Sequence, residues 1–130
     1  MTAYKQAHSN RPSRWFAAAI LGTFLLVQPT HVFAIAGLEG TFEAVLSTDE
    51  ERSYKPAPRA YKMALDALAL KREEVVFAPF AGWDAAGAKW FGYPTFWVNR
   101  LDLPPERLGV APDAVGRNLA DLVRFTSASG

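Results

Sequence analysis

The segment Glu74-Val75-Val76-Phe77-Ala78 decides the fold class, because its apolar residues follow one another without the alternation of a half-exposed strand. A β-branched and aromatic run of this kind is typical of a strand that is buried on both faces. The sequence therefore predicts here a strand in a sheet that other elements cover.

The segments around this strand alternate between helix and strand patterns. From Pro58 to Leu70, apolar residues recur at i, i+3, i+4 and i+7, which predicts an amphipathic helix that packs on a sheet. The alanine-rich run from Trp83 to Phe91 predicts a second helix, with Gly92 as its C-terminal cap. Pro94 to Asn99 predicts a second strand, and Thr41 to Leu46 another short element. This order predicts an α/β fold with parallel strands and right-handed crossovers.

The composition limits the chemistry that the chain can perform. The 130 residues suit one small domain, and a net charge of +1 gives no electrostatic case for a nucleic-acid partner. No cysteine is present, and the only histidines are His8 and His31, so thiol chemistry, histidine triads and histidine-rich metal sites are disfavoured. Carboxylates, lysine and tyrosine must carry any reaction.

The first 36 residues differ from the rest of the chain. Basic residues without any acidic one precede an uncharged run from Trp15 to Val27, and Ala34-Ile35-Ala36 follows as a small-x-small pattern. This arrangement fits an export signal, but a buried strand from Ala18 to Leu21 fits the same apolar run, and the pattern does not separate the two. We therefore divide the chain into a signal-like or strand-forming segment (residues 1–36), a core (37–125) and a tail (126–130).

Two charged residues stand where ligands bind in a parallel sheet. Pro56 and Pro58 each fix their own φ and restrict the residue before them, so Lys55 is held just ahead of a helix. Asp84 falls in the first turn of the helix that follows the Val75 strand, at the carboxyl end of the sheet. A solvated lysine and a helix-capping carboxylate explain each residue locally. Alternatively, Lys55 and Asp84 face each other and keep each other ionised.

Several motifs taken together resemble one family. They are Tyr54-Lys55-Pro56-Ala57-Pro58, Tyr61, Gly82-Trp83-Asp84-Ala85-Ala86-Gly87-Ala88-Lys89, Phe91-Gly92-Tyr93-Pro94 and Trp97-Val98-Asn99-Arg100. This combination resembles the second half of the type II haloacid dehalogenases, the (S)-2-haloacid dehalogenases of the haloacid dehalogenase superfamily, from about Ala36 to Phe125. The resemblance implies a partial Rossmann-like core with parallel strands and flanking helices, in which the family's cap domain and first strand are missing.

The resemblance also implies a mechanism and a set of site residues. In that family an aspartate displaces halide from C2 of a small 2-haloacid, and water then cleaves the ester, without a metal or another cofactor. Lys55 would lie beside this nucleophile, Asp84 would anchor Lys55 and help to order the hydrolytic water, and Tyr61 would line the substrate end. Family members are often homodimers, and neither a nucleic-acid nor a membrane partner is expected.

The chain departs from the family pattern in ways that affect its expected activity. Pro79-Phe80-Ala81-Gly82-Trp83-Asp84 stands where the family has Ser-Ser-Asn-Ala-Trp-Asp, and neither the nucleophile motif Asp-x-x-Gly-Thr nor a Ser-Asn-Gly ahead of Lys55 is present. We therefore expect a dehalogenase-like hydrolase that is inactive as the isolated chain. The alternative is a non-catalytic fragment or binding module, which could be exported. We expect a cytoplasmic protein, because removing residues 1–36 would remove a strand and expose the sheet edge.

Overall fold

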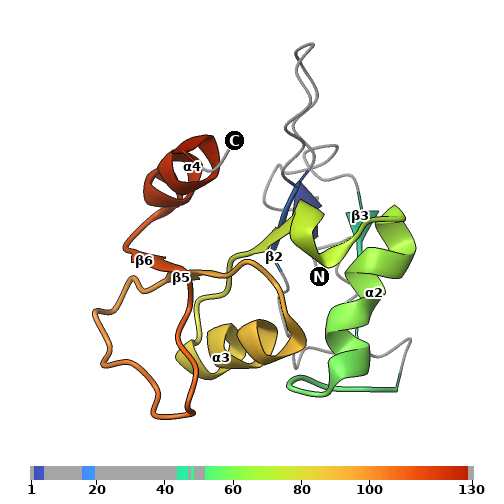
Figure 1. Ribbon diagram of the computed structural model, residues 1–130, viewed down its shortest axis with the longest axis horizontal. Coiled ribbons are helices and arrows are strands. Elements are labelled where there is room, and N and C mark those ends of the chain that lie inside the picture. Colours follow the sequence, from blue (N-terminus) through green and yellow to red (C-terminus); the bar gives the residue numbers. More distant parts are fainter. Residues whose placement is uncertain (1, 5–15, 20–43, 47, 49–51, 129–130) are drawn as a thin grey trace, which may run out of the picture.

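The computed structural model describes residues 2–4, 16–19, 44–46, 48 and 52–128. Figure 1 shows the arrangement of its elements. The strands are β1 (Thr2–Tyr4), β2 (Phe16–Ala19), β3 (Ala44–Val45), β4 (Val75–Phe77), β5 (Phe96–Val98) and β6 (Ala114–Gly116). The helices are α2 (Pro58–Leu68), the short 3-10 helix η1 (Arg72–Glu74), α3 (Gly82–Phe91) and α4 (Leu119–Ala128).

Strands β2, β4, β5 and β6 are joined by parallel pairing. One group of strands has the order β3-β1-β2-β4, in which β2 pairs with β4 in parallel, and β5 and β6 form a second parallel pair. A parallel bridge between Phe77 and Thr95 joins the two groups, and the Phe77 N–H donates to the Pro94 carbonyl at 2.8 Å. The predicted α/β fold with parallel strands is therefore confirmed. Strand β1, which pairs antiparallel with β2 and β3, was not predicted.

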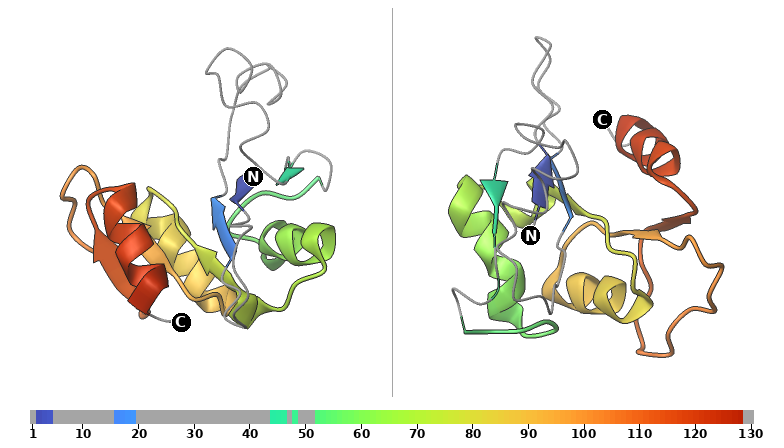
Figure 2. Two further views of the ribbon diagram at one scale, coloured as in Figure 1. Left: turned by 90° about the horizontal axis from the view of Figure 1, so that it is seen from above. Right: turned by 180° about the vertical axis from the view of Figure 1, so that it is seen from behind.

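The side chains of β4 face alternate sides of the sheet, and different helices cover the two sides. Val75 and Phe77 belong to one core cluster together with residues of α2 and α3, whereas Val76 belongs to a second cluster with Leu122 of α4. All three residues of β4 are fully buried. Figures 1 and 2 show α3 and α4 on opposite sides of β5 and β6. The strand is thus buried on both faces, as its continuous apolar run predicts.

The helix ends follow from local backbone chemistry. Helix α2 begins with Pro58, whose missing N–H costs no hydrogen bond in the first turn, and it ends at Ala69 with a φ of 51°. Helix α3 ends at Gly92, whose φ is 100° and whose N–H donates to the carbonyls of Ala88 and Lys89. Glycine adopts this left-handed conformation without a Cβ penalty, so the predicted cap is confirmed.

Of the N-terminal segment (residues 1–36), the structure describes residues 2–4 and 16–19. The strand that was one of the two alternatives, Ala18 to Leu21, overlaps β2, which begins earlier, at Phe16, and pairs with β4. Residues 20–43 lie outside the described part of the chain, and so does the Ala34-Ile35-Ala36 pattern. Within the described residues, no helix is long and apolar enough to cross a membrane.

The connection between β5 and β6 is closed by hydrogen bonds at both of its ends. At one end, the Asn99 side chain accepts from the Leu103 N–H at 2.9 Å and donates to the Leu103 carbonyl at 2.8 Å. At the other end, the Thr95 N–H donates to Oδ2 of Asp113 at 2.7 Å, and the Asp113 N–H donates to the Thr95 carbonyl at 2.9 Å. The residues between these two clamps are mostly exposed.

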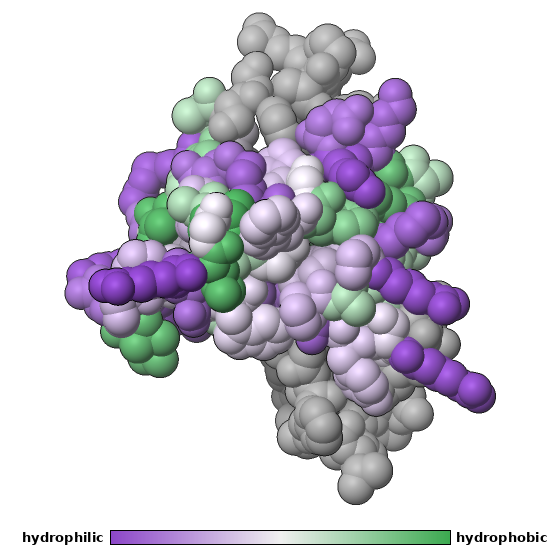
Figure 3. All heavy atoms as spheres, turned by 60° about the horizontal axis from the view of Figure 1, so that its bottom comes forward, coloured by the Kyte–Doolittle hydropathy of each residue, from purple (hydrophilic) through white to green (hydrophobic). Residues whose placement is uncertain are grey.

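The surface carries apolar residues in separate patches among polar ones, as one face of the molecule shows in Figure 3. Among the residues that the structure describes, the most exposed large hydrophobic ones are Leu101, Trp90, Tyr54 and Val123. Apolar atoms make up much of the surface of a folded protein, so exposure alone assigns no function to these residues.

Candidate functional site

Lys55 and Asp84 form a buried ion pair. Nζ of Lys55 lies 2.5 Å from Oδ2 of Asp84, and their side chains are only 5% and 7% exposed. Lys55 lies in the segment before α2, and Asp84 lies in the first turn of α3. The predicted pairing of these charges is confirmed. Strand β3, which precedes Lys55 in the chain, is separated from β4 in the sheet by β1 and β2.

Tyr61 joins this pair from α2. Its hydroxyl donates a hydrogen bond to Oδ1 of Asp84 at 2.8 Å, so the two carboxylate oxygens are held by side chains from two different segments. The Tyr61 side chain is fully buried, and its hydroxyl is directed at the carboxylate. The structure thus brings together all three residues that the sequence singles out, in a cluster that we call the Lys55–Asp84–Tyr61 site.

Burial and charge act in opposite directions on the ion pair. Burial lowers the pKa of Lys55, and the charge and hydrogen bond of Asp84 counteract this effect. Burial likewise raises the pKa of Asp84, against the lowering effects of Lys55 and of the Tyr61 hydrogen bond. Burial, followed by the Asp84 charge, raises the pKa of Tyr61. Each charge is therefore tolerated here because the other is present.

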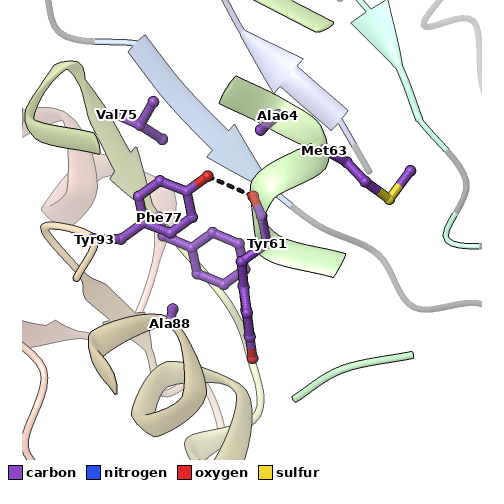
Figure 4. Close-up of a cluster of buried hydrophobic side chains, with 7 residues drawn as sticks. All are labelled: Tyr61, Met63, Ala64, Val75, Phe77, Ala88 and Tyr93. Carbon is purple, nitrogen blue, oxygen red and sulfur yellow. Dashed lines mark hydrogen bonds between the residues drawn. The ribbon is translucent and has the colours of Figure 1, made fainter. Parts of the chain in front are cut away.

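An aromatic cluster packs beside the Lys55–Asp84–Tyr61 site. The Phe77 ring centroid lies 5.2 Å from the Lys55 ammonium, at a distance that suits a cation–π contact, and the ring stacks on Tyr93. The Tyr93 hydroxyl donates to the backbone carbonyl of Tyr61 at 2.6 Å, as Figure 4 shows. Sequence reasoning did not assign Phe77 or Tyr93 to the site. Their signals were the aromatic end of the buried strand and the Phe91-Gly92-Tyr93-Pro94 motif.

The loop before α3 is fixed through its backbone. Ala81, the residue before α3, offers no side-chain cap, in keeping with the loss of the family's polar residues in this loop. Instead, the Pro79 carbonyl accepts from the Val98 N–H at 2.9 Å, and the Phe80 carbonyl accepts from the Trp97 indole N–H at 2.9 Å. Strand β5 therefore positions the start of the helix that carries Asp84.

The carboxylate of Asp84 is oriented by Lys55 and Tyr61. Both of its oxygens accept hydrogen bonds from side chains outside α3, although its place in the first turn also suits the helix dipole. In the part of the chain that the structure describes, no group of three or more His, Cys, Asp or Glu side chains is placed to hold a metal ion.

Curated proteins with similar sequences are dehalogenases. The chain is 40% identical over 100 residues to an (S)-2-haloacid dehalogenase of Pseudomonas sp. strain YL, a match that covers 76% of this chain and 43% of the relative. It is 42% identical over 78 residues to haloacetate dehalogenase H-2 of Moraxella sp. strain B, with 60% of this chain and 35% of the relative covered. No family model matches the chain.

Solved structures agree with the sequence comparison. An L-2-haloacid dehalogenase structure with 44% sequence identity superposes with a TM-score of 0.70 and covers 75% of this chain and 45% of that one. The L-2-haloacid dehalogenase of Xanthobacter autotrophicus, at 29% identity, superposes with a TM-score of 0.73 and covers 79% of this chain and 53% of that one. Both comparisons thus identify 2-haloacid dehalogenases as the relatives of this chain, which spans less than half of the length of the curated relatives that it matches.

Proposed function

We propose that the Lys55–Asp84–Tyr61 site is the supporting part of a site for hydrolytic dehalogenation of small 2-haloacids. The observation that carries this proposal is the buried Asp84 carboxylate, which Lys55 and Tyr61 hold by different oxygens. A buried charge network of this kind is typical of functional sites, although structural networks also occur. A relative that is 40% identical over 100 residues carries the name (S)-2-haloacid dehalogenase.

The proposed roles follow from charge. A carboxylate nucleophile must be ionised, and the Lys55 ammonium would favour that ionised form at a distance of about 4–6 Å. The charge and hydrogen bond of Asp84 raise the pKa of Lys55 against the lowering effect of burial. Each carboxylate oxygen of Asp84 has a second lone pair, which could accept a hydrogen bond from the water that cleaves the ester. Tyr61 would line the substrate end, as the resemblance implies, and its hydroxyl orients the Asp84 carboxylate.

The nucleophile has to come from outside these 130 residues, because they contain no Asp-x-x-Gly-Thr. We expect that the chain alone releases no halide from 2-chloropropanoate, because losing a covalent nucleophile usually abolishes the reaction. We expect release when the chain is mixed with a second chain that carries the nucleophile half of a relative, and loss of that release with Lys55→Ala. A matched control is Lys62→Ala, at an exposed lysine on α2.

Two outcomes would contradict this proposal. Halide release by the purified chain alone that disappears with Lys55→Ala would place a nucleophile within these residues. No release from any mixture, despite formation of a complex, would favour the alternative of a non-catalytic fragment or binding module. That alternative predicts that 2-chloropropanoate shifts the NMR signals of Lys55 and Tyr61 without turnover.

We also propose that the protein is cytoplasmic. Strand β2 pairs with β4 in parallel, so removal of residues 1–36 would take away β1 and β2 and leave β4 without this partner. Unpaired edges promote aggregation, so an exported form would be unfavourable. Fractionation of a bacterial host, followed by N-terminal sequencing, tests the proposal. A periplasmic species that begins at Gly37 would contradict it.

The resemblance further leads us to propose a homodimer. Light scattering of the purified chain gives its mass in solution, and a mass of one chain at every concentration would contradict this proposal.

A further inference from the structure

Gly87 lies where the three segments of the site meet. It follows Asp84 by three residues in α3, and residues three apart share one face of a helix. A Cβ atom built on Gly87 would lie 2.3 Å from the Tyr61 hydroxyl oxygen, 3.2 Å from the Tyr61 Cζ and 3.1 Å from the Pro56 Cβ. The first of these distances is far below van der Waals contact. Tyr61 therefore occupies the space that a side chain at residue 87 would fill.

The crowded atom is the one that binds the carboxylate. The Tyr61 hydroxyl that a Cβ would displace is the donor to Oδ1 of Asp84 at 2.8 Å. The Tyr61 ring has little room to move away, because it is fully buried against Phe77, Phe91 and Tyr93. Any residue larger than glycine at position 87 must therefore shift the hydroxyl or push α2 away from α3.

We propose that Gly87 is a positioning residue of the Lys55–Asp84–Tyr61 site: its missing side chain admits the Tyr61 hydroxyl to the Asp84 carboxylate and seats the Lys55-Pro56 segment against α3. The cost of glycine inside a helix is consistent with this role, because alanine is the better helix former wherever space allows it. This role of Gly87 rests on the proposed function only in so far as the Lys55–Asp84–Tyr61 site is part of a catalytic site. Its test uses no substrate, so a failed halide assay does not affect the result.

The test is an NMR titration of the Asp84 carboxyl carbon in the full chain. Tyr61→Phe removes a hydrogen bond that lowers the Asp84 pKa, so this pKa rises. We expect Gly87→Ala to raise the Asp84 pKa by a similar amount, and the double variant Gly87→Ala with Tyr61→Phe to match Tyr61→Phe alone. Gly82→Ala is the control in the same helix: its Cβ would also be crowded, by the Glu106 Cγ at 3.0 Å and the Trp97 ring at 3.2 Å, but neither residue belongs to the Lys55–Asp84–Tyr61 site. An Asp84 pKa that stays at the wild-type value in Gly87→Ala would overturn the proposal.

A second measurement covers the case in which Gly87→Ala does not fold. Overpacking of this kind lowers the folding equilibrium constant by roughly ten- to hundredfold. Removing the crowded hydroxyl should restore most of this loss, so the double variant is expected to unfold in urea at a higher concentration than Gly87→Ala. A double variant that is no more stable than Gly87→Ala would show that the hydroxyl is not what residue 87 accommodates, and the proposal would be wrong.

Discussion

The ammonium group of Lys55 and the carboxylate of Asp84 meet 2.5 Å apart, although 29 residues separate them in the chain. Helix α2 and strand β4 lie between them in sequence, so the contact forms only when both elements pack correctly. Buried ion pairs add little net stability, because desolvation offsets the attraction between the charges, whereas a buried charge without its partner is costly. The pair therefore makes the correct packing of these segments a condition for stability.

Lys55→Met is expected to reduce the free energy of unfolding by about 3–5 kcal/mol at neutral pH, because it leaves the Asp84 carboxylate buried without its cation. Burial raises the pKa of Asp84. A raised pKa adds stability at low pH that is lost as the pH rises through the folded-state value. The penalty of Lys55→Met should thus shrink on acidification.

Urea unfolding at a series of pH values measures this penalty. Lys62→Met is the matched control, because Lys62 makes an exposed ion pair with Asp66 one helical turn later, and pairs of that kind contribute about 0–1 kcal/mol. A Lys55→Met penalty that is independent of pH would be inconsistent with a buried carboxylate at Asp84.

Tyr61 and Tyr93 are expected to remain protonated in the folded protein at a pH where free tyrosine ionises. Burial raises the pKa of both, and the Asp84 charge adds to the effect at Tyr61. Because their pKa values in the unfolded chain are about 10, stability should fall as the pH rises above about 10. Urea unfolding measures this fall, and Tyr61→Phe and Tyr93→Phe should each make it less steep. An equally steep fall in both variants would argue against this assignment.

Asp113→Ala is expected to destabilise the fold by about 1–3 kcal/mol, because it removes the acceptor of a buried backbone donor. Oδ2 of Asp113 accepts from the Thr95 N–H at 2.7 Å, and the same carboxylate pairs with Lys89 near the surface. Lys89→Ala removes only the ion pair, so its cost should be below about 1 kcal/mol and should fall further with added salt. Thermal unfolding of both variants compares the two contributions. Equal costs would mean that the ion pair, and not the backbone hydrogen bond, is what matters.

Gly92→Ala is expected to cost about 1–2 kcal/mol, because the φ of 100° at this position forces a Cβ against the following carbonyl. Gly92→Asn should cost less, since asparagine tolerates left-handed backbone better than alanine does. Urea unfolding of the two variants shows which of them is the more stable. If alanine were tolerated as well as asparagine, the helix cap would not depend on the backbone conformation of residue 92.

The sequence was most informative where a signal is local. The run Val75-Val76-Phe77 predicted a strand buried on both faces, and Gly92 predicted the end of α3, because each depends on a few neighbouring residues. The pairing of Lys55 with Asp84 was predicted from their positions at strand ends and from the family resemblance. The position of Tyr61 on the carboxylate depends on the docking of α2 against α3, which no local pattern reveals.

Two elements that were not predicted, β6 and α4, differ in the strength of their local signal. Strand β6 has only three residues, one of them Gly116, and it becomes a strand by pairing with β5. Helix α4 does have a start signal, since Oδ1 of Asn118 accepts from the Asp121 N–H at 3.0 Å, as an N-cap does. Leu122, the buried residue of α4, follows soon after. The cap together with this apolar residue could have located the helix.

Hydrogen bonds anchor the connection between β5 and β6 at its two ends, so its anchoring does not depend on its length. Asn99 closes one end on Leu103, and Thr95 closes the other on Asp113, so the exposed residues between the clamps need not hold the strands in place. Long surface connections change length at little entropic cost when their ends are fixed. We therefore expect this connection to accept an inserted label or foreign peptide while β5 continues to hold the loop that leads to Asp84.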